Sequence, residues 1–228
     1  MKSRSQSVLA SAADIQAIER VITRQRLSTY AGALGMRNAR RTLDLYAWNA
    51  QVAGAFMLPQ QICEVAIRNA AGEVLEAVYG HQWPWALGFE RSLPDPKFGF
   101  SLRKELSSAR GKAPAGNTNK VIPELKFAFW GKLFTQRFDS RLWLPHLRGA
   151  FHGLPAGLPV QQCRQMIYEE LDKVRGLRNR IAHHEPIFQR NLAADYARIA
   201  RLVGWRCPRT AAWMDEVETV RELLGARP

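Results

Sequence analysis

The stretch LRNRIAHHEP, residues 177–186, brings together side chains that could cleave RNA. Arg178 offers a planar guanidinium that can grip a phosphate, and His183 offers an imidazole, a group that exchanges a proton near neutral pH. With Asn179 beside them, they suit the attack of an RNA 2′-hydroxyl on its own phosphodiester, which needs no metal. The HHE cluster lacks the His-Glu-x-x-His spacing of zinc proteases, so we predict no metal and no cofactor.

The same stretch also suits an ordinary helix end. Basic side chains near a helix C-terminus interact favourably with its carbonyl groups, typically by about 0.3–1 kcal/mol. Pro186 would then end the helix soon after. The residues alone leave both interpretations open.

Helical spacing limits which of these residues can act together. Arg175, Asn179 and His183 recur every four positions and share one helix face, so Asn179 can reach His183. Arg178 precedes His183 by five positions, about 140° around an ideal helix, so their side chains would not meet along one straight helix. Joint chemistry therefore requires a bent helix end or a second subunit.

The charge of the chain favours a polyanionic partner. Its 33 Lys and Arg residues outnumber 20 Asp and Glu residues, and the formal net charge is +13. Residues 101–150 carry ten basic and three acidic residues, so much of the excess lies away from LRNRIAHHEP. Nucleic acid is the first candidate, because each neutralised phosphate releases counterions. The 25 arginines against 8 lysines could instead reflect an arginine-rich genome.

Other features indicate a cytoplasmic protein without a membrane partner. No run approaches the roughly 18 apolar residues of a membrane span. The start MKSRSQSVLASAAD lacks the continuous apolar core of a signal peptide. The three cysteines are far apart and odd in number, which indicates reduced core residues rather than a disulfide set; they are Cys63, Cys163 and Cys207.

The elements that must position these residues are helices. Apolar residues recur at helical intervals through most of the chain, and no strand-like alternation competes with them. The predicted helices cover residues 13–35, 38–57, 59–80, 98–109, 123–134, 160–183, 193–203 and 211–224. The aromatic residues of KVIPELKFAFWGKLF and SRLWLPHLRGAF are expected in the core rather than on a base-stacking surface.

Two irregular segments interrupt this pattern. Residues 80–97 are rich in proline and glycine, and residues 111–119 include GKAPAGNTN, so we predict loop insertions at both places. No internal repeat or low-complexity tract is present. We therefore interpret residues 1–228 as a single domain with two insertions.

Four blocks of the sequence resemble one known family. They are LYAWNAQVAGAFMLPQQICEVAIRN at 45–69, ELKFAFWGKLF at 124–134, LW at 142–143 and LRNRIAHHEPIF at 177–188. Their order and spacing are similar to those of Abi-like (abortive-infection) proteins of the HEPN superfamily. The resemblance implies an all-α, HEPN-like helical bundle with additional helices. It also implies a homodimer in which the Arg and His residues of two subunits meet in a cleft, often as a metal-independent endoribonuclease.

The family pattern places Arg178, Asn179 and His183 in the catalytic motif. His184 is an auxiliary candidate, or equally a surface histidine without a role. In the upstream block, Glu64, Arg68 and Asn69 could orient the site. Glu64 and Arg68 could instead form an ordinary helix ion pair at i, i+4. The chain departs from the family at Lys126 and Ala128, where small residues are expected, which bears on local packing rather than on chemistry.

These observations predict a ribonuclease of an abortive-infection or toxin type that acts on RNA as a homodimer. One related subgroup carries a modifiable tyrosine two positions after the motif histidine, where this chain has Glu185. The chain therefore resembles a free-standing effector, which an antitoxin or other regulatory partner could restrain. The alternative is a noncatalytic RNA-binding or scaffold protein with the same fold.

Overall fold

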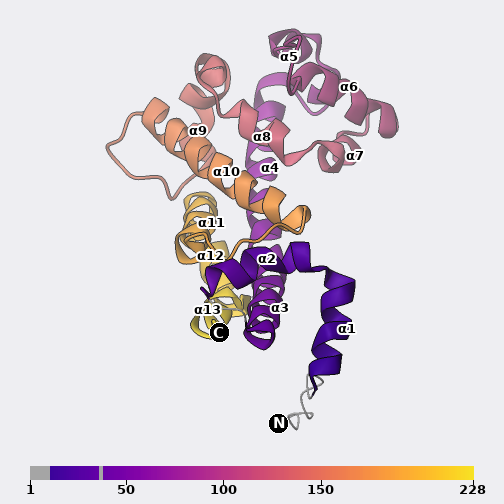
Figure 1. Cartoon of the computed structure of the whole chain (residues 1–228). Coiled ribbons are helices and arrows are strands. Elements are labelled where there is room, and N and C mark those ends of the chain that lie inside the picture. Colours follow the sequence, from indigo (N-terminus) through magenta and orange to yellow (C-terminus); the bar gives the residue numbers. More distant parts are fainter. Residues whose placement is uncertain (1–10, 36–37) are drawn as a thin grey trace.

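The computed structural model describes residues 11–35 and 38–228 (Figure 1). Every regular element in these ranges is a helix, which confirms the all-α prediction. Most of the stretch MKSRSQSVLASAAD, on which the expectation about a signal peptide rests, lies outside the described residues. No helix within them is long and apolar enough to cross a membrane.

The helices fall at the following positions. The α-helices are α1 (Ala12–Ile22), α2 (Arg24–Ala33), α3 (Ala39–Ala55), α4 (Met57–Tyr79), α5 (Leu87–Ser92), α6 (Leu102–Lys112), α7 (Thr118–Val121), α8 (Phe127–Leu133), α9 (Leu144–Ala150), α10 (Val160–Ala182), α11 (Leu192–Arg206), α12 (Pro208–Val217) and α13 (Val220–Gly225). Short 3-10 turns are η1 (Trp83–Trp85), η2 (Ile122–Glu124) and η3 (Gln136–Phe138), and η4 (Asp139–Trp143) is a π-helical turn.

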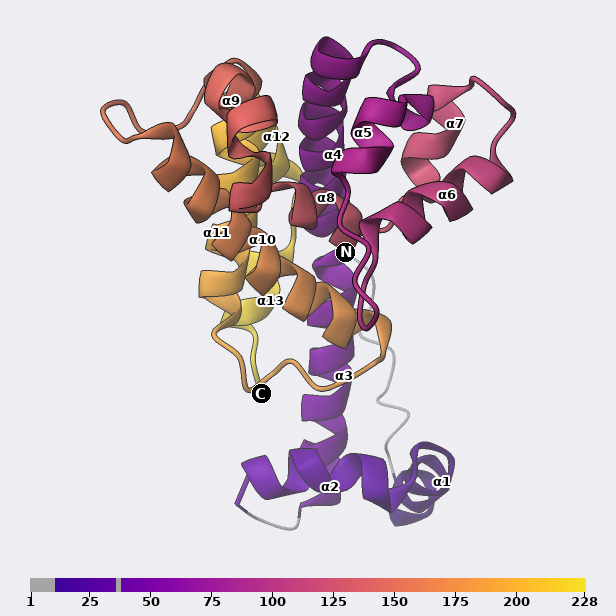
Figure 2. The same cartoon turned by 90° about the horizontal axis from the view of Figure 1, so that it is seen from above.

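The long helix α4 is the centre of the architecture. It follows α3 almost end to end, with Phe56 between them, and α11 packs along it (Figures 1 and 2). On one side of α4 lie α5, α6 and α7, and on the other lie α9 to α13. Trp130 and Trp143 are fully buried, as expected for the two aromatic stretches, and Cys63 and Cys163 are buried as well. Trp83, from the predicted loop insertion, is also fully buried. Cys207 is half-buried at the start of α12.

The first predicted helix is two helices. Ser11 begins α1 with a capping box to Asp14. The helix then breaks at Thr23, which has a φ of 74° and whose hydroxyl accepts a hydrogen bond from the backbone N–H of Arg26. Thr23 therefore caps α2, and α1 projects away from the other helices (Figure 1). The break escaped the prediction because apolar periodicity continues across it.

The two predicted loop insertions are more ordered than expected. Residues 80–97 contain η1 and α5, held by the buried rings of Trp83 and Phe89. Residues 111–119 overlap the end of α6 and the start of α7, which leaves 113–117 between them. Prolines and glycines mark the ends of these short helices rather than a continuous loop. The predicted helix at 211–224 is likewise divided into α12 and α13.

Candidate functional site

The motif residues lie at the C-terminal end of α10. Arg178 and Asn179 belong to its last turns, the helix ends at Ala182, and His183 is the cap residue, with its backbone N–H bonded to the carbonyl of Asn179 at 3.0 Å. The side chains of Arg178 and His183 are exposed, and Asn179 is half-buried. No side-chain hydrogen bond between Asn179 and His183 is present in this described part of the chain.

The helix ends in a Schellman motif that separates the two histidines. The backbone N–H of Glu185 bonds the carbonyl of Arg180 at 2.8 Å, and that of His184 bonds the carbonyl of Ile181 at 3.0 Å. His184 has a φ of 54°, in the left-handed region where such motifs usually place glycine. The chain reverses at this residue, so His183 and His184 are directed differently although they are neighbours.

A cleft of about 760 Å³ lies between α2, α3, α4 and the end of α10. Four predicted site residues line it: Arg178, His184, Glu64 and Arg68. The other three, His183, Asn179 and Asn69, do not. Asn69 lines a second hollow of about 610 Å³ with Arg206 and Trp213. The structure thus gathers Arg178 with the upstream Glu64 and Arg68 and leaves His183 outside the cleft of its own chain.

Three arginines of the cleft have no anionic partner. Arg26 from α2, Arg68 from α4 and Arg178 from α10 form no ion pair or side-chain hydrogen bond within residues 11–35 and 38–228, and Nε of Arg68 is buried without a partner. Glu64 is also unpaired there, so the helix ion pair that it could form with Arg68 is not made. Other arginines are paired, as where Arg164 binds Asp139 at 2.9 Å, and some, such as Arg137 and Arg148, bond backbone carbonyl groups. The cleft therefore offers three guanidinium groups to a ligand, beside the carboxylates of Glu64 and Glu185.

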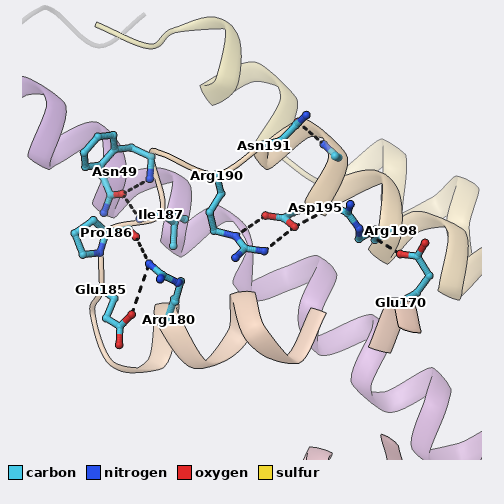
Figure 3. A network of polar contacts seen from close by, with 12 residues as sticks. Asn49, Glu170, Arg180, Glu185, Pro186, Ile187, Arg190, Asn191, Asp195 and Arg198 are labelled. Atoms are coloured by element: carbon cyan, nitrogen blue, oxygen red, sulfur yellow. Dashed lines mark hydrogen bonds and ion pairs between the residues drawn. The ribbon is translucent and has the colours of Figure 1, made fainter. Parts of the chain in front are cut away.

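The segment after the motif is anchored from both sides (Figure 3). Oδ1 of Asn49, on α3, accepts hydrogen bonds from the backbone N–H groups of Ile187 at 2.8 Å and Phe188 at 3.0 Å. On the helix side, Arg180 donates to the carbonyl of Pro186 at 3.2 Å and lies 3.7 Å from the carboxylate of Glu185. These contacts hold the chain that carries His184 against the cleft wall.

Further along, the same segment is tied to α11. Arg190 binds Asp195 with two hydrogen bonds of 2.7 and 2.9 Å, and Asn191 caps the helix by accepting from Ala194. Arg198 then links Asp195 to Glu170 on α10 (Figure 3). This chain of charges joins the start of α11 to Glu170 in the body of α10.

Replacing Asn49 by alanine is expected to lower the free energy of unfolding by roughly 2–6 kcal/mol, because two buried backbone N–H groups would lose this acceptor at about 1–3 kcal/mol each. Asn49 is only 6% exposed and Ile187 and Phe188 are buried, but Asn49 lines the cleft, so water entering there places the loss toward the lower end of this range. Urea unfolding measures the change. Asn49→Asp keeps an acceptor of the same shape and should lose less. An alanine variant as stable as the wild type would contradict this anchoring role.

The cleft includes residues that the sequence did not single out. Arg26, Tyr30, Tyr46 and Asn49 come from α2 and α3, more than a hundred positions before the motif. Of these four, only Asn49 could have been found from the sequence, because it is a polar residue within an apolar helical stripe that includes Trp48 and Val52. Nothing in the local sequence marks Arg26, since its place in the cleft depends on the break at Thr23.

Comparison of the chain with protein families, with curated proteins and with solved structures found no match. Within the described residues, no three His, Cys, Asp or Glu side chains are grouped so that they could hold a metal ion. The ionisable side chains that line the cleft are those of three arginines, one histidine, two tyrosines and two glutamates.

Proposed function

We propose that this protein is a metal-independent endoribonuclease with a HEPN-like fold, active as a homodimer. The observation that supports the proposal is the convergence of the unpaired Arg26, Arg68 and Arg178 on one cleft that also holds Glu64 and His184. Guanidinium groups without carboxylate partners favour a phosphate, which they can bind with paired, charge-assisted hydrogen bonds. The net charge of +13 favours a polyanion over a small anion.

In the proposed reaction, Arg178 holds the scissile phosphate and stabilises the charge that develops on its oxygens. A histidine accepts the proton of the 2′-hydroxyl while that oxygen bonds to phosphorus. The bond from phosphorus to the 5′-oxygen breaks, and the leaving oxygen takes a proton from the imidazolium formed in the first step. The products are a 2′,3′-cyclic phosphate and a 5′-hydroxyl. Glu64 and Arg68 would help to orient the site. Asn179 and Asn69, which lie outside the cleft, would support the residues that line it.

The positions of the two histidines shape this mechanism. His184 lines the same cleft as Arg178, whereas His183 is exposed outside it. In a homodimer related by a two-fold axis beside the ends of α10, His183 of one subunit would face the cleft of the other. We therefore assign proton transfer to His183 across the dimer and an auxiliary role to His184.

The proposed setting is phage defence or toxin-like growth arrest in the cytoplasm, with an antitoxin or other regulatory partner restraining the nuclease. This part of the proposal follows from the resemblance of the four sequence blocks to Abi-like proteins.

A noncatalytic RNA-binding or scaffold role is the second candidate. It is favoured by the place of His183 outside the cleft of its own chain, because arginines alone can hold RNA without a proton-transfer group. The two candidates differ in one measurable respect: a scaffold binds RNA and leaves it intact.

Cleavage of RNA should persist in excess EDTA and yield a 2′,3′-cyclic phosphate or its 3′-phosphate hydrolysis product, because arginine and histidine side chains carry the proposed reaction. The ends of a radiolabelled RNA, treated with and without a phosphatase, distinguish these products from a 5′-phosphate. A DNA strand of the same sequence is the control, since it lacks the 2′-hydroxyl. Equal cleavage of DNA, or strict dependence on added magnesium, would contradict the mechanism.

A further inference from the structure

The walls of the cleft differ in chemistry. The charged residues come from α2, α4 and the end of α10. The wall formed by α3 has no charged residue: Tyr46, Asn49, Ala50, Ala53 and Gly54, all on one face of this helix, line the cleft. Ala50 and Gly54 are exposed, and a Cβ added at Gly54 would meet no atom within 4 Å, so this wall is open. A ligand that fills the cleft should carry an anion on one side and a flat, uncharged group on the other.

The residues of the cleft also carry unpaired polar atoms. Of six buried side-chain nitrogen or oxygen atoms without a hydrogen-bond partner in the described ranges, three belong to its lining: Oη of Tyr30, Nε2 of Gln60 and Nε of Arg68. The side chain of Tyr30 is completely buried and Gln60 is only 7% exposed. Burial raises the pKa of Tyr30, so its hydroxyl keeps its proton and can donate. Each of these atoms is closed off from solvent, so a ligand in the cleft reaches it only if the lining side chains rearrange.

We infer that the cleft holds one unpaired nucleotide of the RNA, with its phosphate at the arginines and its base against the α3 wall. The inference rests on the proposed function and names the form of RNA that the site takes. A volume of about 760 Å³ is typical of a pocket that encloses a small molecule. In a duplex the bases are stacked and paired, so only a single strand, loop or bulge can place a base in such a pocket. Tyr46, half-buried on the wall, offers a ring face for stacking.

Calorimetric titration of the full chain with nucleoside 5′-monophosphates tests the inference, with ribose 5-phosphate as the matched ligand that has no base. At least one of the four nucleotides should bind ten-fold or more tightly than ribose 5-phosphate. A single-stranded RNA should bind more tightly than the same strand annealed to its complement. Ten-fold discrimination is within the range that stacking of one base supplies. Equal binding of the nucleotides and ribose 5-phosphate would overturn the inference.

The variant Ala50→Phe tests where the base binds, because a bulky ring on the exposed surface of α3 would fill the space that we assign to the base. The variant should lose the preference for nucleotides and keep its affinity for ribose 5-phosphate. Ala47→Phe is the control, since Ala47 is exposed on the same helix and does not line the cleft. Unchanged nucleotide preference in a folded Ala50→Phe protein would exclude the α3 wall.

Binding and cleavage report separately on the two proposals. RNA cleavage by a protein that shows no preference for nucleotides would remove the base site and leave the nuclease. A clear preference without any cleavage would leave a nucleotide-binding cleft and remove the nuclease.

Discussion

Replacing Arg178 by alanine is expected to reduce the rate of RNA cleavage by about 10²–10³-fold, the loss typical of removing one group that stabilises charge in a transition state. Arg178 is exposed, lines the cleft and has no carboxylate partner in the described residues, so its positive charge is available to a phosphate. Single-turnover cleavage of a labelled RNA measures the rate. Affinity should fall as well, with a weaker dependence on salt, because the same contact exists before the reaction.

Arg175→Ala is the matched control for this variant. Arg175 lies three residues earlier on α10, binds Asp172 at 2.7 Å and does not line the cleft, so its loss should leave the rate within about two-fold of the wild type, as for a surface residue outside the site. Arg178→Lys should fall between the two, because lysine keeps the charge and loses the planar pair of donors. Equal rates for Arg178→Ala and Arg175→Ala would remove Arg178 from the mechanism.

The fold could be predicted where helical periodicity is strong and its ends are marked. The start of α10 after Pro159 and its end near His183 follow from sequence alone, and α4 ends at Gly80 as expected. The break at Thr23 could not be predicted, because it depends on a backbone φ of 74° in a residue other than glycine. The short helices in residues 80–97 were also missed, because tertiary packing of Trp83 and Phe89 stabilises elements too short to form alone.

The candidate site, too, could be predicted only where regular helical geometry decides the direction of a side chain. Arg68 and Asn69 are adjacent, but neighbouring positions on a helix differ by about 100° in direction, so one lines the cleft and the other a separate hollow. The spacing rule correctly indicated that Arg178 and His183 would not share a face. It could not place His184, because the left-handed turn that directs this residue to the cleft arises where regular helical geometry ends.

His183→Ala is expected to reduce cleavage by about 10²–10⁴-fold with little change in RNA affinity, because a proton-transfer group acts mainly in the transition state. His183 is exposed and makes no side-chain contact that the fold of the described residues needs. His184→Gly is the comparison. Glycine is favoured at the left-handed position, so this variant should be at least as stable as the wild type, with a smaller loss of activity. A greater loss in His184→Gly would assign proton transfer to His184 within one chain.

Mixing two inactive variants tests whether the site is shared between subunits. In a 1:1 mixture of Arg178→Ala and His183→Ala chains, about half of the dimers are mixed. One of the two sites in each mixed dimer has both Arg178 and His183, so about a quarter of the wild-type rate should return. Arg178 faces the cleft of its own chain and His183 does not, so only a partner can complete that pair. Subunit exchange must be verified by mass. No recovery in verified mixed dimers, or full activity in a strict monomer, would show that the site lies within one chain.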